Sequence, residues 1–127
     1  MGQRILIADD QKGIRRLLEE LFKREGWEVI LAADGREAVA KTAEFKPDIV
    51  LMDMKMPNMN GIEAVKRILT DYGDINIIMM TAYGEMEVAK EALKAGVKEC
   101  ITKPFDIFEL VEMVNDLVNK DCHQKIV

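Results

Sequence analysis

Five side chains that could do chemistry together each follow a short apolar run of the sequence. In chain order they are Asp9, Asp10, Asp53, Thr81 and Lys103. Taken singly, each has an ordinary explanation as a helix cap, a turn residue, a strand residue or a surface lysine. Taken together, three carboxylates repel one another unless a divalent cation lies between them. Oxygen-only ligation with room for water suits Mg²⁺ better than Zn²⁺, so the set predicts a magnesium site if the fold gathers it in one place.

The elements that must position these residues can be predicted from hydrophobic periodicity. Apolar runs at 5–8, 29–32, 49–52, 77–80 and 99–101 alternate with helical patterns near 14–22, 38–42, 62–69, 88–93 and 108–118. Continuous apolar strands indicate burial on both faces of a sheet. The pattern therefore predicts an α/β fold with a doubly wound five-stranded parallel sheet, for which we expect the order 2-1-3-4-5.

Polar and small residues mark several predicted element ends. Asn60 is the expected N-cap of the third helix, and Gly26 and Gly96 follow the first and fourth helices. In an open parallel sheet, ligands bind beyond the carboxyl ends of the strands, where the strand order reverses. Asp34 follows the second strand, which lies at an edge in this order, so we expect Asp34 to be only a turn residue.

Length and composition indicate one domain, expected to span residues 1–120 with a frayed tail at 121–127. The net charge of −5 arises from interspersed acidic and basic residues, whereas a nucleic-acid-coating fold would carry a basic face. No apolar run reaches about 18 residues and no signal peptide fits, so we expect a cytoplasmic protein that does not contact a membrane. Cys100 and Cys122 are expected to be free thiols in a reducing compartment.

Four motifs resemble those of the receiver domains of bacterial two-component response regulators, and the resemblance covers residues 4–120. They are IADD at 7–10, LMDMKMP at 51–57, MTA at 80–82 and TKPF at 102–105. The resemblance implies a flavodoxin-like (βα)5 receiver fold. It also implies that a sensor histidine kinase transfers a phosphoryl group to this chain, and that the chain assists this transfer without turning over a small metabolite.

The resemblance further implies a phosphoacceptor and its metal ligands. Asp53 would accept the phosphoryl group. Asp9, Asp10, Asp53 and the backbone carbonyl of Lys55 would hold Mg²⁺, with Mn²⁺ as a substitute. Thr81 would hydrogen-bond the phosphoryl group once it forms.

Lys103 would pair with a phosphoryl oxygen, and its bond to Pro104 would be cis. Phosphoryl transfer passes through a loose transition state, so positioning and charge neutralisation do most of the work. Cys100 departs from the family, because many receivers place an aromatic residue three positions before the lysine. This departure puts switching by an aromatic rotation in doubt.

Within the family, the chain is most similar to the stand-alone receivers of sporulation phosphorelays, in the stretches 9–15, 53–57, 80–85 and 103–106. Such receivers pass their phosphoryl group to a histidine phosphotransfer protein with a helical bundle. Lys55 and Tyr83 lie two residues past Asp53 and Thr81. We expect both to flank the phosphoryl group and obstruct water, the alternative being that both point to solvent.

A partner-binding face is expected where the first helix meets the loops around the site. Its candidate members are Gln11, Gly13, Ile14, Leu17, Tyr83, Pro104 and Phe105. The first helix carries a wider apolar arc than one buried stripe needs. The alternative is that Ile14 and Leu17 belong to the core.

Three rival interpretations stay open. The chain could be the receiver domain of a larger DNA-binding transcriptional regulator. A dehalogenase-like phosphatase would want a second acid where Lys55 stands. A flavin-binding domain would want a Ser/Thr/Gly-rich loop in place of DDQK at 9–12, so the residues favour neither of the last two.

Overall fold

The computed structural model describes residues 3–82 and 84–126 of the chain, with side chains described as far as Asn119. The strands are β1 (Arg4–Ala8), β2 (Glu28–Ala32), β3 (Ile49–Asp53), β4 (Asn76–Ala82) and β5 (Glu99–Lys103). The helices are α1 (Lys12–Arg24), α2 (Gly35–Phe45), α3 (Gly61–Tyr72), α4 (Met86–Ala95) and α5 (Ile107–Ile126). Strands and helices alternate along the chain, as the periodicity predicted.

The five strands form one parallel sheet in the order β2-β1-β3-β4-β5, which confirms the predicted topology. The chain runs outward from β1 to β2 and then returns past β1 to β3, so the order reverses between β1 and β3. Because all strands are parallel, their carboxyl ends share one edge of the sheet. This edge is where such folds bind ligands.

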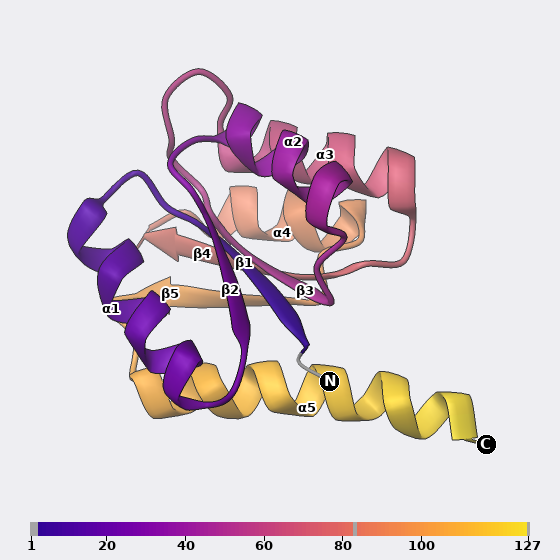
Figure 1. Cartoon of the computed structure of the whole chain (residues 1–127). Helices are drawn as coiled ribbons and strands as arrows, with labels where there is room; N and C mark the ends of the chain where they lie inside the picture. The colour runs from indigo at the N-terminus through magenta and orange to yellow at the C-terminus, as the bar shows by residue number, and fades with distance from the viewer. Residues whose placement is uncertain (1–2, 83, 127) are drawn as a thin grey trace.

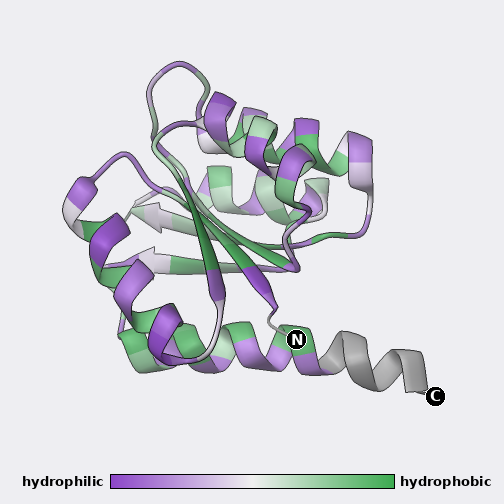
Figure 2. Cartoon of the chain, viewed as in Figure 1, coloured by the Kyte–Doolittle hydropathy of each residue, from purple (hydrophilic) through white to green (hydrophobic). Residues whose placement is uncertain are grey.

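Helices cover both faces of the sheet, with α1 and α5 on one face and α2, α3 and α4 on the other (Figure 1). Side chains alternate between the two layers along each strand, as the pleat requires. In β1, Ile5 and Ile7 pack in the α1/α5 layer, whereas Leu6 and Ala8 pack in the opposite layer. The strands are consequently apolar along most of their length (Figure 2).

An aromatic pair closes the α1/α5 layer at the end of the sheet away from the strands' carboxyl ends. Trp27, the residue before β2, is buried and meets Phe22 of α1 edge to face, with ring centroids 6.4 Å apart. The Trp27 backbone N–H also donates to the Phe22 carbonyl oxygen at 3.0 Å. Leu18 of α1 and Val114 of α5 belong to the same buried cluster.

The helix ends agree with the residues that mark them. The Asn60 side chain accepts a hydrogen bond from the Glu63 N–H at 3.0 Å, which confirms it as the N-cap of α3. Asp34 likewise caps α2 by accepting from the Glu37 N–H at 2.8 Å. Gly96 is the C-cap of α4, with a φ of 121° that favours glycine.

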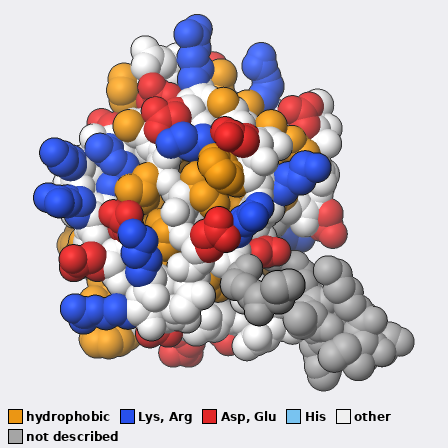
Figure 3. Space-filling model, in the orientation of Figure 1, with side chains coloured by type: hydrophobic (Ala, Val, Ile, Leu, Met, Phe, Trp, Pro, Cys, Tyr) orange, Lys and Arg blue, Asp and Glu red, His pale blue; other side chains and the backbone are white. Residues whose placement is uncertain are grey.

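The α5 backbone continues as helix to Ile126, past the boundary expected at residue 120. That boundary and the fraying of residues 121–127 stay predictions. On the face shown in Figure 3, acidic and basic side chains are interspersed, in line with the charge pattern of the sequence. In the part of the chain that the structure describes, no helix combines the length and the apolar character needed to cross a membrane.

Candidate functional site

Strand register brings the first two acidic positions together. Ala8 and Met52 are partners in the pairing of β1 with β3. Asp9 and Asp53 directly follow these two residues in the sequence, so they lie side by side. Asp53 in turn is the partner of Met80, directly before Thr81. The predicted residues therefore meet at the carboxyl edge of the sheet because of the register.

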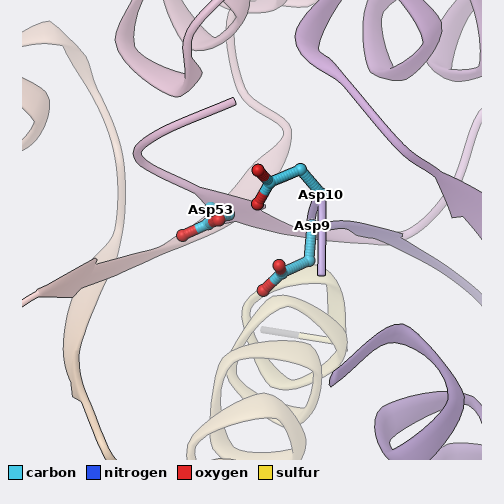
Figure 4. A group of neighbouring side chains, drawn as sticks. All are labelled: Asp9, Asp10 and Asp53. Atoms are coloured by element: carbon cyan, nitrogen blue, oxygen red, sulfur yellow. The ribbon is translucent and has the colours of Figure 1, made fainter. Parts of the chain in front are cut away.

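Three carboxylates converge at this edge (Figure 4). Asp9, Asp10 and Asp53 each place one oxygen so that the three atoms lie within 4.8 Å of one another. Asp9 and Asp53 are buried, whereas Asp10 is exposed. Two oxygens on one Mg²⁺, at about 2.1 Å each, lie roughly 3–4 Å apart, so small side-chain movements suffice for a shared cation. An all-oxygen set with one open side fits Mg²⁺ or Mn²⁺.

Lys103 contacts two of these three carboxylates. Its Nζ lies 2.7 Å from Asp9 Oδ2 and 3.2 Å from Asp53 Oδ1. Burial alone would lower the pKa of Lys103, but the hydrogen bond to Asp9 and the charges of Asp53 and Asp9 outweigh it and raise the pKa above its usual value. The ammonium therefore stays charged beside the acceptor candidate.

The surroundings of Asp53 disfavour its charged form. Burial and the neighbouring charge of Asp9 raise the pKa of Asp53 to about 6, against the opposing charge and hydrogen bond of Lys103. Asp10 adds a smaller raising effect. Asp53 is thus ionised near neutral pH, although burial and the Asp9 charge make its negative charge unfavourable. A nearby divalent cation would offset this unfavourable charge.

Backbone contacts fix the loops that carry these side chains. The Gln11 N–H donates to Asp9 Oδ1 at 2.9 Å, and Arg15 Nη1 donates to the Asp9 carbonyl oxygen at 2.7 Å. Arg15 was not among the predicted site residues, although it ends the stretch 9–15 that is similar to sporulation receivers. The N-cap residue of α1 is Gln11, whose side chain makes no capping hydrogen bond. Asp10 is therefore not the N-cap of this helix.

The start of α3 packs directly behind Asp53. The Gly61 N–H donates to the Met54 carbonyl oxygen at 2.8 Å, and the Met54 N–H donates to the Met80 carbonyl oxygen at 3.0 Å. A Cβ on Gly61 would collide with the carbonyl oxygen of Asp53. Glycine is therefore required here for close backbone approach, which holds the β3–α3 loop against the acceptor candidate.

Thr81, Pro104 and Lys55 are further predicted site residues that the structure describes. The buried Thr81 hydroxyl is 3.5 Å from the Ile101 carbonyl oxygen, a long contact across to β5. The bond from Lys103 to Pro104 is cis, as the resemblance implied. The Lys55 side chain is 81% exposed, and the prediction for Tyr83 lies outside the described residues.

Glu85, which was not among the predicted site residues, connects two of these loops. Its Oε1 accepts from the Ala82 N–H at 2.6 Å, and its Oε2 lies 3.7 Å from Lys55 Nζ. It ends the stretch 80–85 that is similar to sporulation receivers, but its residue type alone does not assign it a role. Only the fold reveals it beside the site.

The predicted partner face is partly exposed. Gln11, the N-cap of α1, is exposed, as are Gly13 and Leu17 within the helix and Pro104 in the β5–α5 loop. Leu17 is 48% exposed, so it is not the core residue that the alternative required. Ile14 and Phe105 are half-buried against the α1/α5 layer, and their docking role stays a prediction.

Cys100 is a free, half-buried thiol, as predicted, and Cys122 lies among residues whose side chains the structure does not describe. The Cys100 Sγ is 3.8 Å from the Ala89 carbonyl oxygen of α4. Burial and, to a smaller extent, the charge of Glu99 raise the pKa of the Cys100 thiol. The thiol is therefore less reactive than an exposed cysteine.

Comparison with known proteins agrees with this geometry. Residues 5–115 match the family model of the response regulator receiver domain. The chain is 45% identical to sporulation initiation phosphotransferase F of Bacillus subtilis over 114 residues, which cover 90% of this chain and 92% of that protein. It is 46% identical to the chemotaxis protein CheY of Thermotoga maritima over 116 residues, or 91% and 97% of the two chains.

Two further matches extend the comparison. The chain is 45% identical over 107 residues to the regulatory protein AtoC of Escherichia coli, covering 84% of this chain but only 23% of that protein. Among solved structures, the complex of CheX, CheY, BeF3 and Mg from Borrelia burgdorferi matches with a TM-score of 0.85 and 34% identity, covering 91% of this chain and 88% of that chain. From the family match and these relatives, the chain belongs to the response regulator receiver domain family.

Proposed function

We propose that this receiver accepts a phosphoryl group on Asp53 from a sensor histidine kinase and passes it to a histidine phosphotransfer protein in a phosphorelay of the sporulation type. Sporulation initiation phosphotransferase F is similar to this chain over most of both lengths, which supports the relay. The expected setting is the cytoplasm, with no direct binding to nucleic acid or membrane. No small metabolite is turned over.

One observation carries the proposal. The oxygens of Asp9, Asp10 and Asp53 lie within 4.8 Å of one another, and Lys103 contacts Asp9 and Asp53 at 2.7 and 3.2 Å. A cation and an ammonium would then flank the same carboxylate. This arrangement neutralises charge on both sides of a phosphoryl group, which is what this transfer requires.

The chemistry follows from these positions. An Asp53 oxygen forms the new bond to phosphorus while the bond from phosphorus to the donor's imidazole nitrogen breaks, and the electron pair of that bond stays on the nitrogen. Lys103 compensates the charge on a phosphoryl oxygen. Mg²⁺ held by Asp9, Asp10, Asp53 and the Lys55 backbone carbonyl would supply further charge neutralisation, with Mn²⁺ as its substitute. Onward transfer is the reverse step toward a second imidazole.

Thr81, Lys55 and Tyr83 are proposed to act after the transfer. The Thr81 hydroxyl, whose present contact to Ile101 is long, would turn toward the phosphoryl group and donate to it. Lys55 and Tyr83 would limit the approach of water. An unchanged rate of phosphoryl loss in a Lys55→Asn, Tyr83→Ala double variant would refute the shielding role.

The test is phosphotransfer from candidate histidine kinases, with Mg²⁺ and with a chelator, followed by addition of a histidine phosphotransfer bundle. We expect Mg²⁺-dependent labelling of the wild type and none of Asp53→Ala, because that variant lacks the nucleophile. Asp116→Ala, which removes an exposed aspartate of α5, is the control and should label normally. Undiminished label on Asp53→Ala would move the acceptor elsewhere.

A second candidate function is that of a receiver within a larger DNA-binding transcriptional regulator. It is supported by AtoC, of which the chain matches only 23%. Efficient onward transfer to a histidine bundle favours the relay. Dimerisation and DNA binding by a longer product of the same reading frame favours the regulator.

The partner face is proposed to be the exposed part of α1 with the β5–α5 loop. Replacing the exposed Leu17 by Ala should slow transfer between proteins, because an apolar contact is lost at the interface, while leaving labelling by a small acyl phosphate unchanged. Equal loss with both donors would assign Leu17 to the acceptor site or to folding instead.

A further inference from the structure

We propose that the Glu85 carboxylate is a positioning group that competes with the phosphoryl group of Asp53 for two donors, the Ala82 N–H and the Lys55 ammonium. In the unphosphorylated chain Glu85 holds both donors, and a phosphoryl group must displace it to use them. This inference rests on the proposed role of Asp53 as acceptor, and it names a residue that regulates the occupied state.

The contacts of Glu85 are unusually inward for a glutamate at the start of a surface helix. Its side chain is only 14% exposed, although it stands at the N-cap position of α4. Its Oε1 accepts from the Ala82 N–H at 2.6 Å, and its own N–H donates to the Ala82 carbonyl oxygen at 3.2 Å. The carboxylate therefore folds back onto the end of β4 instead of extending into solvent.

The second oxygen of Glu85 reaches the neighbouring loop. Its Oε2 lies 3.7 Å from Lys55 Nζ, and the Lys55 side chain is otherwise 81% exposed. A single carboxylate thus links the β4–α4 loop to the β3–α3 loop. An isolated surface ion pair contributes little to stability. The main effect of this ion pair is therefore on the position of the Lys55 side chain and not on the stability of the fold.

The two donors border the acceptor. Lys55 stands two residues after Asp53, and Ala82 stands at the end of β4, two residues after Met80, the strand partner of Asp53. Both belong to the rim onto which the Asp53 carboxylate opens. A phosphoryl group attached there brings close to two negative charges and three acceptor oxygens.

The Glu85 carboxylate and a phosphoryl group on Asp53 cannot both use these two donors. The Ala82 amide has one hydrogen to donate, and a doubly charged acceptor binds a donor more strongly than a carboxylate does. The phosphoryl charge also repels Glu85. Phosphorylation therefore releases the carboxylate from Ala82 and Lys55, and the work of displacing it lowers the affinity of the site for a phosphoryl group.

Beryllofluoride, which mimics a phosphoryl group on a carboxylate, provides the probe. Its dissociation constant is measured by calorimetry in excess Mg²⁺ for the wild type, Glu85→Gln and Glu85→Ala. Glu85→Ala removes both contacts, whereas Glu85→Gln keeps an acceptor for the Ala82 N–H and removes only the charge. We expect Glu85→Ala to bind about threefold to tenfold more tightly, the effect of about one hydrogen bond, and Glu85→Gln to show a smaller gain.

Glu87→Ala is the matched control. Glu87 lies in the first turn of the same helix, carries the same charge and is exposed, with Lys90 as its partner at 4.0 Å. Its replacement should leave the affinity within about twofold, because the long-range effect of an exposed charge is screened. A gain equal to that of Glu85→Ala would reduce the effect to net charge and overturn the inference.

Lys55→Ala separates positioning from simple stabilisation. If Glu85 acts partly through Lys55, the effects of Lys55→Ala and Glu85→Ala on affinity are not additive, and the double variant measures their coupling. Unchanged or weaker binding by Glu85→Ala, while the wild type binds, overturns the inference and leaves the acceptor role intact. A wild type that neither binds beryllofluoride nor takes label from a small acyl phosphate overturns the acceptor role, and the inference with it.

Discussion

At the scale of the residue, Asp53 is a carboxylate placed where its charge is disfavoured. Burial and the Asp9 charge raise the pKa of Asp53 to about 6, and Lys103 only partly opposes them. In the unfolded chain the same group ionises near its ordinary pKa of 3.8. The folded protein therefore holds a proton on Asp53 more tightly than the unfolded chain does, which links stability to pH.

The first prediction concerns this linkage in metal-free solution. The stability gained by protonating Asp53 is fully present below pH 3.8 and is lost as the pH rises through about 6. Replacing Asp53 by Asn removes the disfavoured charge and should raise the free energy of unfolding by on the order of 2–3 kcal/mol at pH 7, and about half as much at pH 5. Urea denaturation followed by circular dichroism in EDTA measures both values.

The control for this prediction is Asp116→Asn, which neutralises an exposed aspartate and should change stability by less than about 0.5 kcal/mol. A gain for Asp53→Asn that is absent at pH 7, or equal at both pH values, would show that burial does not strain the carboxylate.

The second prediction concerns a variant that lacks the Lys103 ammonium. Lys103→Met leaves Asp9 and Asp53 without their shared partner, so the pKa of Asp53 should rise above about 6, and metal-free stability at pH 7 should fall by about 2–3 kcal/mol. Carbon-detected NMR titration and urea denaturation measure the two effects.

Lys98→Met provides the comparison for Lys103. Lys98 pairs with Asp74 at a similar distance of 3.2 Å, but the Asp74 side chain is 96% exposed. The loss there should stay below about 1 kcal/mol, because water screens exposed pairs. Equal losses at the two lysines would contradict the buried character of the Lys103 contacts.

At the scale of the element, the start of α3 depends on the absence of a side chain at Gly61. The third prediction is that Gly61→Ala costs about 1–3 kcal/mol, because its methyl group would overlap the Asp53 carbonyl oxygen and push the β3–α3 loop outward. Urea denaturation should show the lower stability, and the affinity for Mg²⁺ should fall because the displaced loop borders the metal site.

Gly13→Ala is the matched substitution. Gly13 lies in α1, and among the described residues no atom beyond its chain neighbours and the nearby helix backbone comes within 4 Å of the position that a methyl group would take there. Alanine at this position should therefore stabilise the chain by about 0.5–1 kcal/mol. A tolerated Gly61→Ala variant with unchanged Mg²⁺ affinity would show that the loop adapts freely.

Element positions were the part of the fold that sequence reasoning predicted best. Apolar runs located every strand to within about two residues, because strands buried on both faces leave a continuous signal. Asn60 was recognised because its side chain can accept from an amide three residues ahead. The α4 helix begins at Met86, before the predicted Val88, since its first two residues are solvent-exposed and do not extend the buried apolar pattern.

The site was predictable only as far as the topology decides it. Asp9, Asp53 and Lys103 all lie at strand ends, so the parallel sheet alone brings them to one edge. The link from Glu85 to Lys55 and the Thr81 contact with Ile101 depend on loop conformation and side-chain rotamers. Such details follow from packing across loops, which local sequence does not encode.

At the scale of the whole molecule, the site exists only in the folded chain. Lys103 and Asp9 stand 94 residues apart in sequence, and β1, β3 and β5 must assemble before their side chains can meet. A cation that needs this assembly binds the folded state and not the unfolded chain. Ligand binding and global stability are therefore coupled.

The fourth prediction follows from this coupling. Mg²⁺ at about 100 times its dissociation constant should stabilise the wild type by about 2.7 kcal/mol, and chelation should reverse the gain. Asp10→Asn should lose most of it, because the most accessible carboxylate of the group is gone. Thermal denaturation with Mg²⁺ or EDTA measures the difference, and Asp116→Asn should respond like the wild type. An Asp10→Asn variant that gains as much would place the cation elsewhere.

The position of Trp27 has a consequence for spectroscopy. It is the only tryptophan of the chain, and it packs against Phe22 at the end of the sheet opposite the acidic group. Its intrinsic fluorescence should thus respond to separation of α1 from β2 and stay constant when an ion or phosphoryl group arrives at the far edge. A second fluorophore, introduced as Phe105→Trp two residues after Lys103, would give each end of the molecule its own optical signal.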